Sequence, residues 1–381
     1  MTNERVNMSA PDITEGDIAA VVEVLRSGRL SLGPMQERLE RSVADYCEVK
    51  HAVAVSSGTA ALHLMVRALG IGPGDEVLVP SFTFAASVNC ILYERAVPVF
   101  VDIEPDTYNL DPVDLERKIT PRSRAVVAVD CFGHPADWEA LESLAHKYDL
   151  RVIDDSCEAL GARYRDRPLG SFGNAAAFAF YANKQITTGE GGIIVTNDAK
   201  IAELCRSWRN QGRGSMGTWL EHEWLGYNYR LDEMSAALGA SQMERLDTIL
   251  AKRAAVAQMY NDRLKDLPWV RVPFARPDVR VSWFVYVVTL EHGIDRTRVV
   301  TRLAEEGVPA RSYFPPVHEQ PYLRQIAQAA TGGLGVLKPE GLPVTLDVAG
   351  RTLALPFHSN LTTAEVDLVV DALTKASGFS R

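Results

Sequence analysis

The 381-residue sequence lacks the short motifs that identify several enzyme classes. It contains no P-loop and no H-E-x-x-H pair, so kinase and zinc-protease chemistry lose their usual support. Its five cysteines (Cys47, Cys90, Cys131, Cys157 and Cys205) are scattered and form no C-x-x-C pair. This spacing argues against disulfides and against a metal site, and it fits a reducing cytoplasm. We therefore expect five buried thiols that pack as small apolar residues.

Charge and hydropathy argue against two kinds of partner. The net charge is −9, from 49 acidic and 40 basic residues, so the phosphate backbone of a nucleic acid is disfavoured. No run of eighteen apolar residues occurs, and the first twenty residues lack the apolar centre of a signal peptide. We expect a cytoplasmic globular protein without a membrane span.

Short apolar runs alternate with helical patterns through the first two thirds of the chain. Continuous apolar strands separated by helices predict an α/β fold with a mostly parallel sheet that is covered on both faces. The runs that predict strands are 51–57, 76–80, 97–103, 125–130, 151–155, 175–181 and 192–197, and the helical patterns are 15–28, 35–47, 60–69, 84–94, 137–148 and 198–208.

The pattern changes after about residue 245. We expect one long helix from Asp232 to about Leu267, a strand at 281–290, a helix at 295–307 and a last helix from Thr363 to about Ala376. The Pro-rich, aromatic stretch 312–322 predicts a loop. The sequence thus predicts a larger domain at 1–245, with an N-terminal helical segment, and a smaller α+β domain at 246–381.

Polar motifs follow three of the predicted strands, where ligands sit in open α/β sheets. The first motif is Ser56-Ser57-Gly58-Thr59, which precedes a predicted helix. Its free N–H groups and the helix dipole suit a phosphate, although a helix cap with a turn glycine is the commoner reading of the motif alone.

The other two motifs supply a carboxylate and an amine. Asp154 and Asp155 end one strand, where a carboxylate can cap a helix, bind a metal or pair with a cationic ring. Lys184 follows another strand, just before the glycine-rich turn 189–192. A surface lysine is the commoner reading of such a position, but burial would make the amine nucleophilic.

An anion cradle, a carboxylate and an amine, in this order, match the needs of pyridoxal 5′-phosphate (PLP). The phosphate needs the cradle, the pyridine nitrogen needs an acidic partner, and the aldehyde needs an amine with which to form an imine. The sequence therefore predicts a PLP site built from these three motifs.

The chain resembles the DegT/DnrJ/EryC1/StrS family of PLP-dependent sugar aminotransferases, which have the aspartate aminotransferase fold (PLP fold type I). The resemblance runs from about Ser31 to Leu373. It is carried by SGTAALHL (57–64), PSFTFAAS (80–87), VDIEPDTYNLDP (101–112), VIDDSCEALGA (152–162), NKQITTGEGG (183–192), GYNYRLDEMSAALG (226–239) and YFPPVHEQPY (313–322).

The resemblance implies a role for each matching position. Lys184 corresponds to the Schiff-base lysine, and Asp155 to the acid that faces the pyridine nitrogen. Phe84 corresponds to the aromatic residue that stacks on the ring. The remaining positions are Gly58, Thr59 and Ala60 for the phosphate turn, Asn228 for a contact with the neighbouring subunit's cofactor, and Tyr313 and His318 for the loop beside the sugar nucleotide. The role of Asn228 implies a homodimer with shared active sites.

This sequence departs from the family pattern at three positions. Ala179 stands five residues before Lys184, where many relatives carry a phosphate-binding Ser, so that another donor must replace the hydroxyl. Ala182 stands where Pro is frequent. Glu158 stands where His or Gln is common, and it could hydrogen-bond the ring hydroxyl, the incoming amine or only the protein.

The resemblance implies an enzyme that takes an amino group from glutamate, holds it as pyridoxamine 5′-phosphate (PMP), and passes it to a keto sugar of a nucleotide-sugar. The segment 178–192 together with Glu158 resembles the perosamine-type synthases, and this resemblance implies a 4-keto-6-deoxy hexose. A 3-keto sugar or a cyclitol is the alternative within the family. A silent regulatory homologue is disfavoured by the intact pair of Lys184 and Asp155. A lysine in place of the dehydratases' His argues against dehydration, and Cys157 is poorly placed for a desulfurase.

Overall fold

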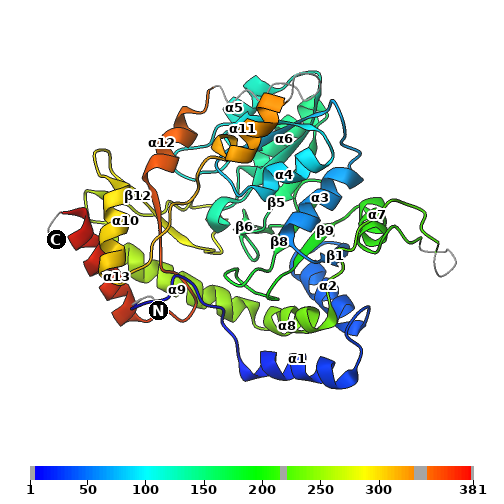
Figure 1. Ribbon diagram of the computed structural model, residues 1–381, viewed down its shortest axis with the longest axis horizontal. Coiled ribbons are helices and arrows are strands. Elements are labelled where there is room, and N and C mark those ends of the chain that lie inside the picture. Colours follow the sequence, from blue (N-terminus) through cyan, green and yellow to red (C-terminus); the bar gives the residue numbers. More distant parts are fainter. Residues whose placement is uncertain (1–4, 215–220, 330–340, 379–381) are drawn as a thin grey trace.

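A seven-stranded sheet forms the centre of the computed structural model, which describes residues 5–214, 221–329 and 341–378 (Figure 1). Its order is β1 (His51–Val55), β9 (Gly192–Thr196), β8 (Ala175–Ala179), β5 (Arg151–Asp155), β4 (Ser123–Val129), β2 (Glu76–Pro80) and β3 (Val97–Val101). Only β9 runs antiparallel to its neighbours, β1 and β8. The prediction of a mostly parallel sheet is therefore confirmed.

Helices cover both faces of this sheet, because its strands are apolar on both sides. The helices of this part are α1 (Glu15–Ser27), α2 (Pro34–Tyr46), α3 (Gly58–Ala68), α4 (Ala86–Tyr93), α5 (Pro112–Lys118), α6 (Trp138–Tyr148), α7 (Ala199–Arg209) and α8 (Glu233–Met243). All but α5 match a helix predicted from the sequence. A 3-10 turn, η1 (Cys131–Gly133), and the small sheet of β11 (Val279–Arg280), β6 (Arg163–Tyr164) and β7 (Arg167–Pro168) lie beside it.

A smaller unit lies at one side of the large sheet (Figure 1). Its three-stranded sheet has the order β10 (Val270–Arg271), β12 (Tyr286–Leu290) and β13 (Thr352–Leu355), and it packs with α9 (Leu246–Leu264), α10 (Arg296–Glu305) and α13 (Thr363–Ser377). The connection from α10 to β13 contains η2 (Val317–Glu319), α11 (Pro321–Ala329) and α12 (Pro343–Arg351). The sequence reading missed α11 and α12, and η2 lies within its predicted loop.

Two predicted elements are shorter than expected, each because of a specific contact. The long helix from 232 breaks at Arg245, whose backbone leaves the helical region and whose guanidinium pairs with Asp17 at 2.7 Å. The strand at 281–290 begins only at Tyr286, because the backbone N–H groups of Ser282 and Phe284 donate to the 132–133 turn instead of to a neighbouring strand.

The N-terminal stretch joins the smaller unit although it precedes the large sheet. Val6 packs in the apolar cluster of that unit, and the backbone N–H of Phe357 donates to the carbonyl of Met8 at 3.0 Å. Residues 5–8 thus contact the unit that we expected to begin at 246. The domain division at 245 stays a prediction.

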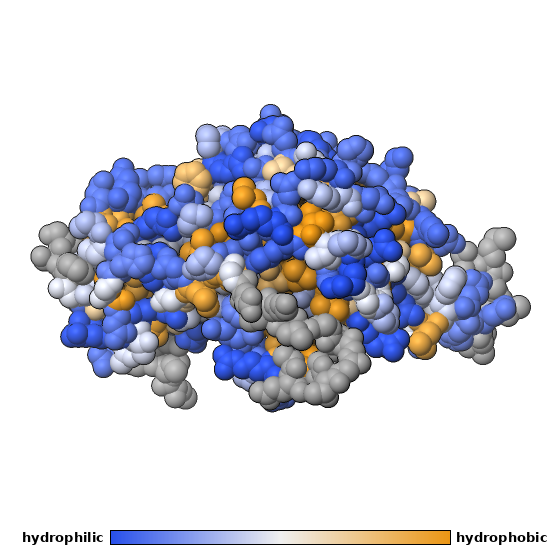
Figure 2. Space-filling view, turned by 90° about the horizontal axis from the view of Figure 1, so that it is seen from above, coloured by the Kyte–Doolittle hydropathy of each residue, from blue (hydrophilic) through white to orange (hydrophobic). Residues whose placement is uncertain are grey.

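The surface seen in Figure 2 is mainly hydrophilic, with hydrophobic patches towards its centre. Within the described residues, no helix combines the length and the apolar character that crossing a bilayer requires.

Asp154 belongs to a buried pair of carboxyls behind the sheet. The Ser156 hydroxyl lies 2.6 Å from Asp130 Oδ2 and 2.7 Å from Asp154 Oδ1, and all three residues are fully buried. A hydroxyl has one proton, so a carboxyl must donate the second hydrogen bond. Asp130 also accepts the N–H groups of Ala136 and Trp138, which favours Asp130 as the ionised member and Asp154 as the protonated one.

This pair predicts a loss of stability at high pH. Burial raises the pKa of Asp130 to about 6 and also raises the pKa of Asp154, so the folded chain holds protons that the unfolded chain has released. The stabilisation is therefore complete below about pH 4 and is lost as the pH rises through 6. Asp154→Asn keeps the hydrogen bonds without an ionisable group, and we expect it to reduce the loss of unfolding free energy between pH 5 and 9 by about 1–3 kcal/mol.

Urea unfolding at a series of pH values measures this effect. Asp166→Asn, at an exposed turn, is the matched control. A pH dependence that is identical in the Asp154→Asn variant, the control and the parent chain would show that the pair does not share a proton.

Candidate active site

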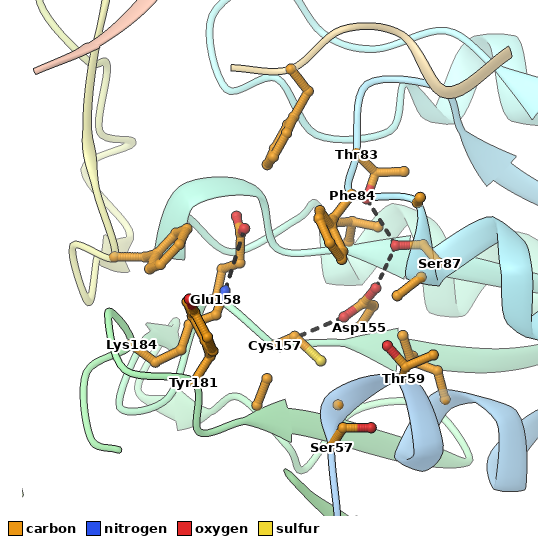
Figure 3. A pocket seen from close by; sticks show the side chains of 18 of the residues that line it. Ser57, Thr59, Thr83, Phe84, Ser87, Asp155, Cys157, Glu158, Tyr181 and Lys184 are labelled. Atoms are coloured by element: carbon orange, nitrogen blue, oxygen red, sulfur yellow. Dashed lines mark hydrogen bonds and ion pairs between the residues drawn. The ribbon is translucent and has the colours of Figure 1, made fainter. Parts of the chain in front are cut away.

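A pocket of about 680 Å³ lies at the carboxyl ends of the parallel strands. It is bounded by the start of α3, the turn before α4, the end of β5 and the segment after β8, and by residues 284, 312–315, 317 and 320 from the later part of the chain. Figure 3 shows that the side chains of these segments converge on one space. This is where the sequence predicted that its polar motifs would meet.

The start of α3 offers an anion cradle on one wall. Ser57 caps the helix, and its hydroxyl accepts the N–H of Ala60 at 3.1 Å. Gly58 and Thr59 line the pocket, and the first N–H groups of a helix have no partner within it. The structure therefore places Gly58 and Thr59 where an anion could bind, whereas the N–H of Ala60 is already used by Ser57.

Glycine is required at the floor of this cradle. A Cβ on Gly58 would lie 2.7 Å from the Cβ of Ala179 and 2.9 Å from the Sγ of Cys157. Gly192, at the end of the glycine-rich turn, has the same constraint, because its Cβ would lie 2.5 Å from the carbonyl carbon of Ser57. Ala179 therefore lies beside the cradle, at the place where the sequence lacks the hydroxyl common among relatives.

Asp155 lies at the base of the pocket and is held by two donors. The Ser87 hydroxyl donates to Asp155 Oδ2 at 2.6 Å, and the N–H of Cys157 donates to Oδ1 at 3.3 Å. Ser87 has only one proton, so it accepts the hydroxyl of Thr83, which is 2.8 Å away. The carboxylate is 5% exposed and points into the pocket (Figure 3).

Lys184 enters the pocket from the side opposite α3. Its Nζ lies 3.5 Å from Oε1 of Glu158 and 3.7 Å from the ring centre of Phe284. Only 12% of the lysine side chain is exposed. The amine is thus held between a carboxylate and an aromatic face, and it is not a surface lysine.

Glu158 is anchored by the backbone of a different loop. Its Oε2 accepts the N–H of Phe132 at 3.0 Å, and its backbone carbonyl accepts the side-chain amide of Gln185 at 2.6 Å. Burial raises the pKa of this carboxyl, while the nearby Lys184 lowers it.

Phe84 and Cys157 lie on opposite sides of the space between Asp155 and Lys184 (Figure 3). Phe84 is 64% exposed, which is unusual for a phenylalanine and leaves its ring face open to the pocket. Four of the five cysteines are buried as expected, but Cys157 is partly exposed because it lines the pocket. The prediction of five buried thiols was wrong for this residue.

Of the three remaining residues that the family resemblance implies for the site, only Tyr313 lines the pocket. Tyr313 lines the pocket and stacks on Phe132 with the ring centres 6.3 Å apart. His318 does not line it, and its Nδ1 lies 2.6 Å from the Ser81 hydroxyl. Asn228 is exposed and lies outside the pocket of its own chain.

The sequence reading assigned no role to several residues that build the site. Thr83 and Ser87 orient Asp155 through a chain of two hydrogen bonds. They lie four residues apart in the motif PSFTFAAS, and this spacing, which places two side chains close together at the start of a helix, could have indicated their contact. Arg253 is buried on α9, and its guanidinium donates to the carbonyls of Asn183 and Phe284, both at 3.0 Å. It thereby ties the segment that carries Lys184 to the segment whose Phe284 ring covers the amine. No local sequence pattern predicts a contact between a helix side chain and the backbone of distant segments.

The residues present fit the phosphate, the ring nitrogen and the aldehyde of PLP. Gly58 and Thr59 offer N–H groups and the space of a missing Cβ for the phosphate. Asp155 offers a carboxylate for the pyridine nitrogen, and Lys184 offers an amine for the aldehyde. Within the described residues, no cluster of His, Cys, Asp and Glu could hold a metal ion.

Comparisons with known proteins agree with this geometry. Residues 11–374 match the model of the DegT/DnrJ/EryC1/StrS aminotransferase family. The chain is 39% identical to the GDP-perosamine synthase of Caulobacter vibrioides, over 97% of both chains. It is 40% identical to the dTDP-3-amino-3,4,6-trideoxy-alpha-D-glucose transaminase of Streptomyces venezuelae, over 93% of this chain and 90% of that one.

Solved structures show the same fold. The S. venezuelae enzyme DesV, in complex with a ketimine intermediate, superposes with a TM-score of 0.88 at 38% identity, over 96% of this chain and 95% of that chain. The PLP form of a putative sugar aminotransferase from Streptococcus pneumoniae gives a TM-score of 0.90 at 27% identity, over 98% of both chains. The predicted PLP fold type I is confirmed, and the chain belongs to the DegT/DnrJ/EryC1/StrS family of PLP-dependent sugar aminotransferases.

Proposed function

We propose that this aminotransferase moves an amino group from glutamate to the keto carbon of a nucleotide-linked 4-keto-6-deoxy hexose. The observation that carries the proposal is the placement of Lys184 and Asp155 in one pocket, with the start of α3 beside them. An amine, a buried acid and an anion cradle in this arrangement are the parts that transamination on PLP requires.

When bound, PLP supplies an electrophilic aldehyde and a pyridine ring that withdraws electrons from the substrate. Gly58 and Thr59 would hold the phosphate through their N–H groups. Asp155 would keep a proton on the ring nitrogen. The Ser87 hydroxyl, which accepts a hydrogen bond from Thr83, would hold the Asp155 carboxylate in place by donating to it. Phe84 would pack on one face of the pyridine ring.

Lys184 would carry the cofactor and then move protons. Its amine lies beside Glu158 and Phe284, in surroundings that exclude most water. The free amine would take the proton from the α-carbon of the amino donor and would deliver it as the amino group is transferred. The same amine would move the corresponding protons when the keto sugar receives the amino group.

The aromatic residues of the pocket suit a sugar with apolar faces. Tyr181, Tyr313 and Phe314 line the pocket together with Phe84 and Phe284, and Tyr181 is 52% exposed. Aromatic rings of this kind stack on C–H groups and accommodate a methyl group. The name of the relative at 39% identity, GDP-perosamine synthase, and the presence of Glu158 support the 4-keto-6-deoxy hexose as the acceptor.

A 3-keto sugar is the second candidate acceptor. One observation favours it: a relative at 40% identity is named dTDP-3-amino-3,4,6-trideoxy-alpha-D-glucose transaminase. A regulatory role has the support of one relative's name, sensory transduction protein EryC1, at 39% identity. The intact Lys184 and Asp155 favour an active enzyme.

A second copy of the chain would complete the site. Tyr227 and Tyr229 pack towards α3, so Asn228 between them points away from its own pocket. Among the described residues that line the pocket, Lys184 is the only cation, against the carboxylates of Asp155, Glu158 and Glu190. Asn228 of a second copy would add a donor for the cofactor phosphate, as the family resemblance implies for a homodimer.

The first prediction concerns where the pyridine ring of PLP binds. If the ring lies between Phe84 and Cys157, bound PLP will shield the Cys157 thiol from a small thiol reagent. We expect methyl methanethiosulfonate to modify Cys157 at least roughly tenfold more slowly in the PLP-loaded protein, as measured by peptide mass spectrometry. The four buried cysteines are internal controls. Equal rates with and without PLP would place the ring elsewhere.

The second prediction concerns Lys184. Lys184→Ala removes the amine that binds the aldehyde of PLP. The yellow colour of the lysine-bound cofactor, which borohydride bleaches by reducing the C=N bond, should therefore disappear. Turnover should fall by roughly 10²–10⁴-fold or more, because the general base is lost with the amine. Absorbance spectra and amino-transfer assays measure both effects, and Lys147→Ala, at an exposed helix position, is the control. Full activity of Lys184→Ala would end this mechanism.

The third prediction separates the acceptors. The enzyme is incubated with glutamate and matched 4-keto and 3-keto nucleotide sugars, and the products are identified by mass spectrometry and NMR. We expect kcat/KM for the 4-keto-6-deoxy sugar to exceed that for the 3-keto sugar by at least roughly tenfold, since a misplaced carbonyl is not aligned with the cofactor. The opposite ratio would select the second candidate.

A further inference from the structure

The Lys184 amine has a fixed partner within the protein. Its Nζ faces Oε1 of Glu158 at 3.5 Å, and the ring of Phe284 covers another side at 3.7 Å. The second oxygen of Glu158 is held by the N–H of Phe132 at 3.0 Å. Only 10% of the Glu158 side chain and 12% of the Lys184 side chain are exposed. Both groups are therefore kept facing each other, largely away from water.

Burial makes it easier for the Glu158 carboxylate to take up a proton. A carboxylate and an ammonium both lose hydration when they are buried, and their attraction offsets only part of that cost. Burial raises the pKa of Glu158, and Asp155 adds to the rise. The groups that face Glu158 are Lys184, Asp155, Cys131, Cys157 and Tyr313, and Lys184 is the one cation among them. The only charge that balances Glu158 in this set is thus the one on Lys184.

We propose that Glu158 is the proton partner of Lys184 and holds the proton that the amine must shed before it can act as a base. An N–H bond of the ammonium breaks, its electron pair stays on Nζ, and an O–H bond forms on Oε1 of Glu158. The reverse transfer restores the ion pair, so no other reactant is needed. The proposal rests on the proposed function for the use of the proton, but the pairing itself belongs to the chain alone.

A purely structural role for Glu158 makes different demands. The hydrogen bond from Phe132 needs only an acceptor oxygen, which the amide of glutamine also provides. Glu158→Gln therefore preserves the anchor and the shape but removes the group that exchanges a proton with Lys184. The variant separates the two roles without a cavity or a new buried charge.

The test measures two quantities that should move in opposite directions. In protein stripped of cofactor, Glu158→Gln leaves the ammonium without its counter-charge, so a larger share of Lys184 is the reactive neutral amine. We expect trinitrobenzenesulfonate to modify Lys184 roughly tenfold faster at neutral pH, as measured by peptide mass spectrometry. In the PLP-loaded enzyme, kcat should fall roughly 10²-fold with little change in KM, because the proton acceptor is lost.

Two further variants complete the experiment. Glu158→Asp keeps a carboxylate and should recover part of kcat compared with Glu158→Gln. Glu190→Gln removes another carboxylate of the pocket wall, one with no ion pair to Lys184 among the described residues, and it should leave the modification rate of Lys184 unchanged.

Each outcome decides the question. Faster modification with a lower kcat supports the proposal. Faster modification with normal kcat makes Glu158 a counter-ion only, and an unchanged modification rate shows that the pair does not interact; either result overturns it. A parent enzyme that fails to transfer amino groups to any sugar would overturn the proposed function, while the modification rates would still decide whether Glu158 controls Lys184.

Discussion

The contact between the Lys184 amine and the Glu158 carboxylate is the interaction on which this site depends. Its partners come from different segments, the loop after β8 and the turn after β5, and they meet because parallel strands end at one edge of the sheet. Without the carboxylate, the charge of a buried lysine would be unpaired, and without the lysine, the charge of a buried glutamate would be unpaired. The pair makes a reactive amine compatible with a folded core.

The smaller unit of the chain holds this arrangement in place. Phe284 covers the amine, and Arg253 on α9 donates to the backbone carbonyls of Asn183, next to Lys184, and of Phe284. Burial lowers the pKa of Arg253 to about 10, while the charge of Asp12 raises it, and backbone carbonyls accept the hydrogen bonds of the guanidinium. The pocket thus lies between two parts of the chain, and the aromatic residues of the 312–320 segment close its other side.

The sequence predicted the strands of the large sheet and the three motifs at their ends, because apolar runs and glycine-rich turns are local signals. Gly58, Asp155 and Lys184 were found in this way, and the family resemblance added Phe84 and Tyr313, all of which line the pocket. The break at Arg245 and the late start of β12 were missed, since each follows from a contact with a distant segment. His318 and Asn228 lie outside the pocket of their own chain.

The amino-acid sequence by itself determined the α/β order of elements, the family and the chemical types of the site, because these depend on the periodicity and motifs of short segments. Only the tertiary structure decided which groups meet. It turned Asp154 and Asp155, neighbours in sequence, to opposite faces of β5, one into a buried proton-sharing pair and one into the pocket. It also placed Glu158, Phe284 and Arg253 around Lys184, because such contacts arise from packing between distant segments and leave no local pattern in the sequence.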